Sequence, residues 1–288
     1  MKGVTEKLVI YRGLREKCVE QKKLSLQEFL HPLMLKVVSL ICNKNIKILN
    51  AEKLPKKDEV CIYAFNHTNG HDFPTAACTV KNHFYILADY TMQKDLLVNI
   101  VNRLNGVIYV DRKNKESRAI AKDKLLEKLS DGKNVFIFPE GTWNLTPNKM
   151  MLPLNWGIIE IARLSGVPII PAAIEYKDNK AYVNVGDRFY VQENDDKKIK
   201  IDELTDVMAT LRWKLISSFG VTKRNSLPKD AYDQFVNAAL ATYKKLDYEY
   251  EQSVILKKDV TSDDVYECMN NVEVTKNNAF LLSKKIHN

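Results

Sequence analysis

The fold class follows from one stretch of the sequence, residues 60–72, which reads VCIYAFNHTNGHD. Its first six residues are apolar, and a short apolar run that ends in a turn is typical of a strand buried on both faces. The residues that follow, NHTNGHD at 66–72, include Asn69 and Gly70, which favour a turn. We expect this turn at the carboxyl end of a central strand, where open α/β sheets bind ligands.

Further strand-like runs follow along the chain, and helical patterns separate them. The helical pattern at residues 117–130 places Ile120, Leu125, Leu126 and Leu129 on one stripe. The strand-like runs are FYILAD (84–89), GVIYV (106–110), NVFIF (134–138), PIIPAAIEY (168–176) and AYVNVGD (181–187). This alternation predicts an α/β fold with a mostly parallel or mixed central sheet flanked by helices.

Three parts follow one another along the chain. Residues 1–48 are expected to be an N-terminal helical segment, in which Ser25 and Glu28 fit a capping box. Residues 49–200 are expected to form the α/β domain. Residues 201–288 are expected to be a C-terminal helical extension and tail, with helices at 201–219 and 228–248.

The N-terminal segment contains the longest apolar stretch, FLHPLMLKVVSLIC at residues 29–42. It is shorter than the roughly 20 residues that a spanning helix needs, and it contains His31, Pro32 and Lys36. No signal peptide is visible before it. We expect this basic, apolar segment to bind a membrane peripherally, on the cytoplasmic face. Packing of the same residues on the α/β core is an equally good interpretation.

The composition narrows the classes of partner. The net charge of +8 and the pI near 9.0 favour an anionic partner, although Lys could equally serve solubility. No nucleic-acid-binding module is recognisable, so nucleic acid is not an expected partner. The five cysteines form no C-x-x-C pair, which indicates neither a disulfide framework nor a zinc site and favours a reducing cytoplasm.

The turn after the first strand contains a candidate general base. Histidine is the natural general base near neutral pH, and a carboxylate such as Asp72 can accept the second N–H of His67 and fix its tautomer. A single His-x-x-x-x-Asp arises by chance about one time in four in a chain like this one. His67 and His71 could instead be metal ligands one helical turn apart, but Asn69 and Gly70 between them are poor helix formers.

Several motifs that would indicate other classes of enzyme are absent from the sequence. No G-x-S-x-G, G-x-G-x-x-G or Walker phosphate loop is present, which argues against serine hydrolases and nucleotide enzymes and predicts no cofactor. Three further blocks follow the His67 turn in order. They are Gly106, Tyr109 and Arg112; Phe138, Pro139, Glu140, Gly141 and Thr142; and Val167, Pro168 and Pro171.

Together with Asn66, His67 and Asp72, these blocks resemble the PlsC-like family of lysophosphatidic acid and glycerol-3-phosphate acyltransferases over roughly residues 45–190. Lys94 and Leu96 resemble the family's Lys-x-Leu segment. The resemblance implies transfer of a fatty acyl group from acyl-CoA or acyl carrier protein to the hydroxyl of a lysophospholipid, with no cofactor and no metal. His67 would be the general base and Asp72 its partner. The residues it implies for substrate binding are Lys94, Arg112, Glu140, Gly141, Thr142 and Trp143.

One position departs from the family pattern. An Arg usually follows the Glu-Gly-Thr, and this chain has Trp143 there. A guanidinium that can fork onto phosphate is thereby replaced by an aromatic ring. The expected acceptor is 1-acylglycerol-3-phosphate, which would give phosphatidic acid, and the alternative is a lyso-lipid without a terminal phosphate. A third alternative is a non-catalytic module that binds lipid or carrier protein, which separated His67 and Asp72 side chains would favour.

Overall fold

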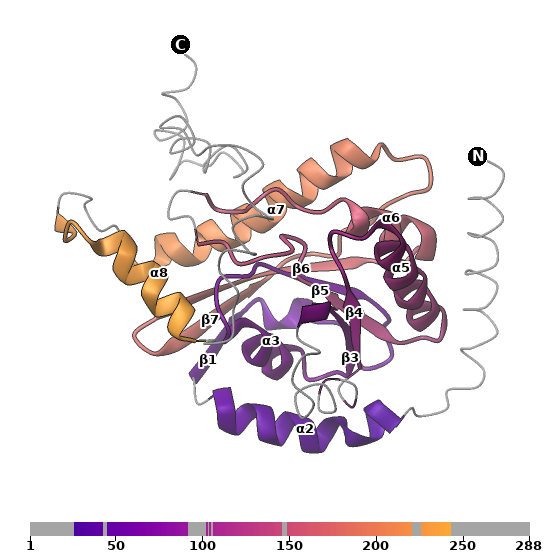
Figure 1. Ribbon diagram of the computed structural model, residues 1–288, viewed down its shortest axis with the longest axis horizontal. Helices are drawn as coiled ribbons and strands as arrows, with labels where there is room; N and C mark the ends of the chain where they lie inside the picture. The colour runs from indigo at the N-terminus through magenta and orange to yellow at the C-terminus, as the bar shows by residue number, and fades with distance from the viewer. Residues whose placement is uncertain are drawn as a thin grey trace, which may run out of the picture.

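The molecule is described here from a computed structural model, in which residues 26–42, 45–91, 102, 104, 106–145, 149–220 and 226–242 are placed. A sheet runs through the middle of this part of the chain (Figure 1), in the strand order β1-β7-β6-β2-β5-β3-β4. The strands are β1 (Asn45–Leu49), β2 (Ile62–Phe65), β3 (Phe84–Asp89), β4 (Val107–Val110), β5 (Asn134–Ile137), β6 (Ile169–Lys177) and β7 (Lys180–Val185). Neighbouring strands are parallel, apart from the antiparallel pair β6 and β7. The predicted α/β class with a mostly parallel sheet is confirmed.

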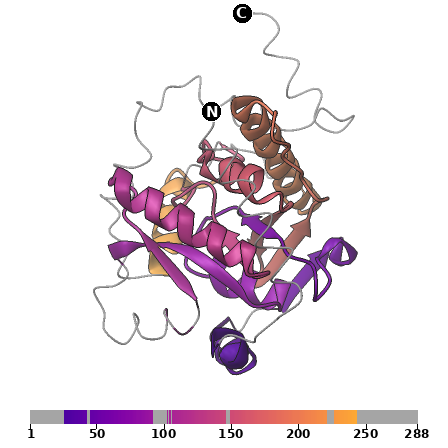
Figure 2. The same cartoon turned by 90° about the vertical axis from the view of Figure 1, so that its right-hand side faces the viewer.

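Helices cover both faces of the sheet, as Figures 1 and 2 show. α5, α6 and α7 pack on one face, and α2 and α3 lie on the other. The helices are α2 (Leu26–Cys42), α3 (Asp72–Val80), α5 (Lys115–Ser130), α6 (Gly157–Ser165), α7 (Lys197–Ser218) and α8 (Ala231–Ala241), with a short 3-10 helix η1 at Ala51–Lys53. The strand-like runs and the helices expected at 117–130 and 201–219 therefore occur close to where the sequence pattern places them. Of the helix expected at 228–248, α8 accounts for residues 231–241, and residues 1–25 and 243–288, which include Ser25 and the predicted tail, lie outside the described residues.

Strand β2 shows why the sheet lies at the centre. Ile62 and Ala64 face the apolar cluster under α5, α6 and α7, whereas Tyr63 and Phe65 face the cluster under α3. All four side chains have no exposed surface. An apolar run without alternation therefore marks a strand that is buried on both faces. The carboxyl end of β2 opens into the segment at residues 66–72.

The predicted helical segment is wrong at its end. Residues 45–49 form β1, which pairs in parallel with β7, rather than the end of a helix. Their sequence, NIKIL, alternates between exposed and half-buried positions, and Ile46 and Ile48 pack against the apolar cluster under α3. A strand of five residues is too short for its period to stand out from the sequence.

Strands β6 and β7 form a hairpin with a two-residue turn at Asp178 and Asn179. Both turn residues have positive φ, 50° and 58°, as a type I′ turn requires. The pairing places Tyr176 opposite Ala181 and Lys177 opposite Lys180. The turn therefore determines which side chains of β6 reach the carboxyl edge of the sheet.

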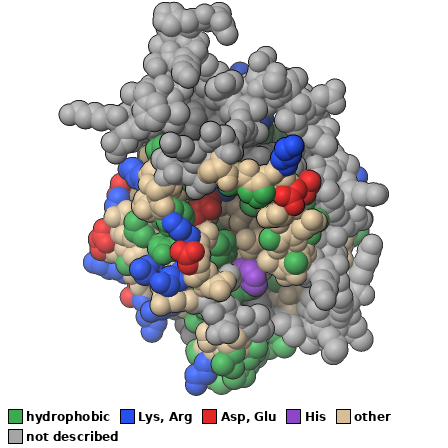
Figure 3. Space-filling model, turned by 90° about the vertical axis from the view of Figure 1, so that its left-hand side faces the viewer, with side chains coloured by type: hydrophobic (Ala, Val, Ile, Leu, Met, Phe, Trp, Pro, Cys, Tyr) green, Lys and Arg blue, Asp and Glu red, His purple; other side chains and the backbone are tan. Residues whose placement is uncertain are grey.

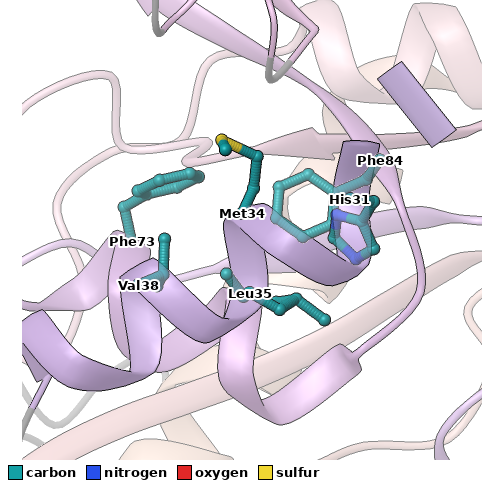
Figure 4. A pocket seen from close by; sticks show the side chains of 7 residues that line it. His31, Met34, Leu35, Val38, Phe73 and Phe84 are labelled. Atoms are coloured by element: carbon teal, nitrogen blue, oxygen red, sulfur yellow. The ribbon is translucent and has the colours of Figure 1, made fainter. Parts of the chain in front are cut away.

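Helix α2 lies against the body of the molecule through one of its faces. Glu28 forms an ion pair with Lys133 at 2.5 Å, and the ring of His31 bonds to the carbonyl oxygen of Lys81 at 2.9 Å. A small apolar pocket lies between α2, α3 and β3 (Figure 4), and its lining residues are His31, Met34, Leu35, Val38, Phe73, Ala77 and Phe84.

The other face of α2 is apolar and exposed. Its large side chains recur every three or four residues and are Leu26, Phe29, Leu33, Val37 and Leu40, with exposed fractions between 44% and 80%. The inner face of the helix thus packs on the core, whereas binding of its exposed outer face to a membrane stays a prediction. In the part of the chain that the structure describes, no helix combines the length and apolarity needed to cross a bilayer.

Candidate active site

The candidate site lies where β2 and β5 end. Asn66, the first residue after β2, is fully buried, and its side chain binds the backbone of Ile174 in β6 in both directions. The amide nitrogen of Asn66 donates to the carbonyl oxygen of Ile174 at 3.1 Å, and its oxygen accepts from the Ile174 N–H at 2.6 Å. The chain is thus held beside β6 as it leaves the sheet, which fixes the position of His67.

His67 and Asp72 are in direct contact. The distance between His67 Nδ1 and Asp72 Oδ2 is 2.8 Å. The Asp72 side chain is fully buried, and the His67 side chain is 19% exposed. A buried carboxylate can only accept here, so Nδ1 carries the proton and Nε2 carries the lone pair. This is the tautomer that a general base needs.

Asp72 also organises the turn that contains it. Its Oδ2 accepts hydrogen bonds from the backbone N–H groups of Thr68 and Asn69, the second at 2.8 Å. Its Oδ1 accepts from the hydroxyl of Tyr176 at 2.8 Å. Because both oxygens have partners, the carboxylate plane cannot rotate away from His67.

A carboxylate in the turn after the neighbouring strand, β5, holds the backbone of His67. Glu140 Oε1 accepts from the His67 N–H at 2.9 Å, and Oε2 accepts from the Leu152 N–H at 2.8 Å. The N–H of Asn144 donates in turn to the carbonyl oxygen of His67 at 2.6 Å. Burial raises the pKa of Glu140 to about 7, against the lowering effects of the nearby Arg212 and of the two backbone donors. Glu140 therefore supports the base and does not face a substrate.

The ring of His67 is held by aromatic contact as well. The Phe138 ring, at the end of β5, stacks on the imidazole with centroids 4.0 Å apart and planes 12° from parallel. Gly141 follows three residues later with φ of 73°, and a Cβ there would lie 2.6 Å from the side-chain nitrogen of Asn155. The turn after β5 therefore requires glycine at this position.

Trp143 contacts His67 directly. Its indole N–H donates to His67 Nε2 at 2.9 Å. The side chain is only 5% exposed and packs with Leu145 and with Ala239 and Leu240 of α8. Thr142, directly before it, is buried as well. On the face of the molecule shown in Figure 3, a histidine side chain lies in a hollow with Lys and Arg side chains gathered to one side.

Arg112 lies at the end of β4, on the far side of the same turn. Its Nε donates to Asp89 at 2.7 Å, and its guanidinium also binds the carbonyl oxygen of Gly141. The structure thus brings the Arg112 block and the Glu140 to Trp143 block together at one edge of the sheet. Lys94, the other basic residue expected to bind substrate, lies outside the described residues.

Two neighbours of the pair were not identified from the sequence. Tyr176 binds Asp72 across the sheet, and Arg212 of α7 binds Glu175 and the carbonyl oxygen of Met150 near Glu140. No local pattern marks either of them. Tyr176 reaches Asp72 because β6 lies beside β2, a pairing that no sequence pattern indicates.

The metal interpretation finds no support in the geometry. His71 is the N-cap residue of α3, and its ring lies edge-on to Tyr176 at 6.4 Å. Among the described residues, no three His, Cys, Asp or Glu side chains gather as a metal site would require. His67 uses Nδ1 for Asp72 and Nε2 for Trp143, so neither nitrogen is directed at a shared ion with His71.

Comparison with known proteins places these residues in a wider context. A family model described as Acyltransferase matches residues 45–175. The 1-acyl-sn-glycerol-3-phosphate acyltransferase of Borreliella burgdorferi is 30% identical over 149 residues, which cover 52% of this chain and 58% of that protein. The protein of the same name from Saccharomyces cerevisiae is 27% identical over 146 residues, 48% of this chain and 45% of its own length.

The chain therefore spans about half the length of the curated relatives it matches. Among solved structures, the 1-acyl-sn-glycerophosphate acyltransferase PlsC from Thermotoga maritima superposes with a TM-score of 0.51 at 19% identity. The superposition covers 76% of this chain and 93% of that one. At this identity the likeness shows a shared fold.

Proposed function

We propose that this chain, whose residues 45–175 match the family model described as Acyltransferase, transfers a fatty acyl group from a thioester to the hydroxyl of 1-acylglycerol-3-phosphate. The product would be phosphatidic acid. The observation that carries the proposal is the contact of 2.8 Å between His67 Nδ1 and the buried Asp72 carboxylate. That contact leaves Nε2 as the basic atom, and the carboxyl end of the sheet is where such a fold binds substrate.

The reaction needs a base and no covalent enzyme intermediate. His67 Nε2 takes the proton of the acceptor hydroxyl as its oxygen forms a bond to the thioester carbonyl carbon. The tetrahedral oxyanion then collapses, the C–S bond breaks, and the leaving sulfur takes the proton back from His67. Asp72 stabilises the imidazolium that exists between these two steps. Acyl carbon, oxygen and sulfur keep their oxidation states throughout.

Arg112 supports a phosphate-bearing acceptor. It lies beside Gly141, on the same edge of the sheet as His67, and a guanidinium can bind phosphate in a bidentate way. Two of the curated relatives are named as 1-acyl-sn-glycerol-3-phosphate acyltransferases. In this proposal Arg112 and Lys94 bind the acceptor phosphate, and Glu140, Gly141 and Thr142 shape the turn that faces it.

Trp143 favours a second candidate, the same transfer to a lyso-lipid without a terminal phosphate. An indole occupies the place of the family's Arg beside His67 and offers apolar or cation–π contact in place of a charge. Acceptor kinetics separate the two candidates. If phosphate is bound, Arg112→Ala should raise the KM for lysophosphatidic acid by about tenfold or more, for a loss of about 1.5 kcal/mol or more. Arg188→Ala is the matched control, because Arg188 pairs with Glu59 at 2.5 Å away from these residues.

The test of the activity is product analysis with a panel of lyso-acceptors. The full chain is given palmitoyl-CoA or palmitoyl carrier protein, since either donor fits the proposal, and the lipids are identified by mass spectrometry. Phosphatidic acid from lysophosphatidic acid supports the first candidate. Product only from phosphate-free acceptors overturns it in favour of the second. No product with either donor on any acceptor leaves the non-catalytic binding module, which the His67–Asp72 contact argues against.

We also propose that the protein works as a peripheral protein at the cytoplasmic face of a membrane, through the exposed apolar face of α2. The inner face of this helix is already docked, so its outer stripe is available to the lipid that supplies the acceptor.

Flotation with vesicles containing phosphatidylglycerol tests the membrane proposal. Phe29→Glu combined with Leu33→Glu should abolish flotation, because both side chains are more than half exposed on the α2 stripe. The matched control is Ile120→Glu with Ile199→Glu, two side chains that are about half exposed or more, at 50% and 58%, on α5 and α7. Equal flotation of the two double variants would contradict the proposal.

A further inference from the structure

Two polar groups that a reacting substrate would use are bonded to other parts of this chain. The lone pair of His67 Nε2 accepts the indole N–H of Trp143 at 2.9 Å. The backbone N–H of Gly70, in the turn between His67 and Asp72, donates to the hydroxyl of Thr242 at 2.8 Å. The base and the turn beside it are therefore covered from the same side, by the turn after β5 and by the end of α8.

Helix α8 holds both contacts in place. Ala239 packs against Trp143 and is 7% exposed, and Thr242 directly follows the helix. The approach to Gly70 is close, since a Cβ on this residue would lie 2.9 Å from the carbonyl oxygen of Thr242. The indole is thus fixed by an element that contributes no residue to the His67–Asp72 pair.

The hydrogen bond from Trp143 is incompatible with proton transfer. Once Nε2 has taken a proton it becomes a donor, and it then faces a second donor, the indole N–H. An acceptor hydroxyl must therefore displace the indole from Nε2 before it can give up its proton. Water faces the same requirement, but a single water molecule lacks the apolar contacts with which a lipid could offset the lost bond.

We propose that Trp143 is a positioning residue that keeps His67 from activating water, and that α8 holds it there until the lipid acceptor displaces it. This inference rests on the proposed acyl transfer. The reaction that it suppresses is thioester hydrolysis: water gives a proton to Nε2, its oxygen bonds to the acyl carbon, the C–S bond breaks, and the thiol leaves with the proton. The products are a free fatty acid and the thiol, with no change of oxidation state.

The first test measures the chemical reactivity of His67 Nε2 and needs no acyl substrate. Diethyl pyrocarbonate carbethoxylates an unprotonated imidazole nitrogen: an N–C bond forms, a C–O bond of the anhydride breaks, and the released ethyl carbonate decays to ethanol and carbon dioxide. Trp143→Phe keeps an aromatic ring but removes the N–H, so His67 should be modified about fivefold faster, as the loss of one neutral hydrogen bond implies. Peptide mass spectrometry measures the rate. Trp156→Phe, at a tryptophan that is 61% exposed, should match the wild type.

The second test measures specificity. Thiol release from palmitoyl-CoA without acceptor, divided by transfer with acceptor, should rise about fivefold in Trp143→Phe. Ala239→Glu should raise the same ratio by displacing α8 without altering any group that contacts His67. Its matched control is Ala238→Glu, because Ala238 is the exposed neighbour on the same helix. Circular dichroism shows whether each variant is folded. If Trp143→Phe does not fold, Ala239→Glu still tests the inference.

The outcomes separate the inference from the proposed function. Carbethoxylation at the wild-type rate in both Trp143→Phe and Ala239→Glu overturns the inference, whatever the enzyme does. Faster carbethoxylation together with no transfer to any acceptor supports the claim that Trp143 shields His67 Nε2, and it overturns the proposed function. Faster carbethoxylation with an unchanged ratio of hydrolysis to transfer overturns the role in excluding water.

Discussion

Replacing Asp72 by Asn should lower kcat/KM for acyl transfer, but by less than the same substitution does in an active site where it reverses the histidine tautomer. An asparagine can place its oxygen at the Oδ2 position, where it accepts from His67 Nδ1 and from the N–H groups of Thr68 and Asn69. Its amide nitrogen then lies at the Oδ1 position and donates to the hydroxyl of Tyr176, which is 2.8 Å away and can accept. The reverse orientation would point an amide N–H at two backbone N–H groups, so it is disfavoured by about 2–6 kcal/mol.

The substitution then removes a charge and keeps the tautomer. Two unit charges about 4 Å apart interact by about 4 kcal/mol at an effective dielectric constant of about 20. The amide oxygen recovers part of this interaction energy, because it still accepts a hydrogen bond from the Nδ1–H of His67. We expect kcat/KM for acyl transfer to fall about a hundredfold to a thousandfold, compared with about ten-thousandfold for a reversed tautomer.

The assay is steady-state thiol release over a range of palmitoyl-CoA concentrations with a saturating lyso-acceptor, which gives kcat/KM for the thioester, beside His67→Ala as the reference for loss of the base. The Tyr176→Phe variant alone should lose about fivefold, for one hydrogen bond of about 1 kcal/mol. Combined with Asp72→Asn it should lose more than the product of the two single effects, because the asparagine amide then has no hydroxyl of Tyr176 to hold its orientation. A loss of about ten-thousandfold in Asp72→Asn, as a reversed tautomer would cause, or strict additivity in the double variant, would refute this reasoning.

Three further outcomes are expected. His67→Ala should reduce transfer about a hundredfold to ten-thousandfold while circular dichroism and melting stay near wild type, and near-normal turnover would exclude it as the base. The folded-state pKa of Glu140 is raised to about 7 from 4.5, so its contribution to stability is lost as pH rises through that window; urea unfolding of Glu140→Gln should lack this loss. The pKa of His83 is lowered to about 4 from 6.5, chiefly by burial, so stability should fall as pH drops from about 6.5 to 4, and less so in His83→Phe. Parallel pH curves for either variant and the wild type would contradict the assignment.

The sheet and the His67 turn could be predicted because their signals are local. An apolar run without alternation marks β2, and the residues after it carry the polar groups of the site. Strand β1 could not be predicted, because five residues next to a helix show too little periodicity. Tyr176 could not be identified because its contact with Asp72 spans 104 residues and depends on β6 lying beside β2.

The orientation of the Trp143 side chain could not be predicted from the sequence either. The residue type indicated only that a charge had been lost, and the expectation was contact with an acceptor head group. In the structure the indole turns to His67 because α8 packs against it, and the pairing of α8 with the turn after β5 follows from tertiary packing. The two faces of α2 likewise become distinct only when Glu28 meets Lys133.

The hairpin between β6 and β7 limits how this protein can be re-engineered. Tyr176 lies two residues before the Asp178–Asn179 turn, and successive side chains of a strand point to opposite faces. A loop graft or tag inserted into that turn that slipped β6 by one position would send the Tyr176 hydroxyl to the other side of the sheet, away from Asp72. A surface turn that would otherwise be a convenient insertion point is therefore a poor place for a fusion or an affinity tag.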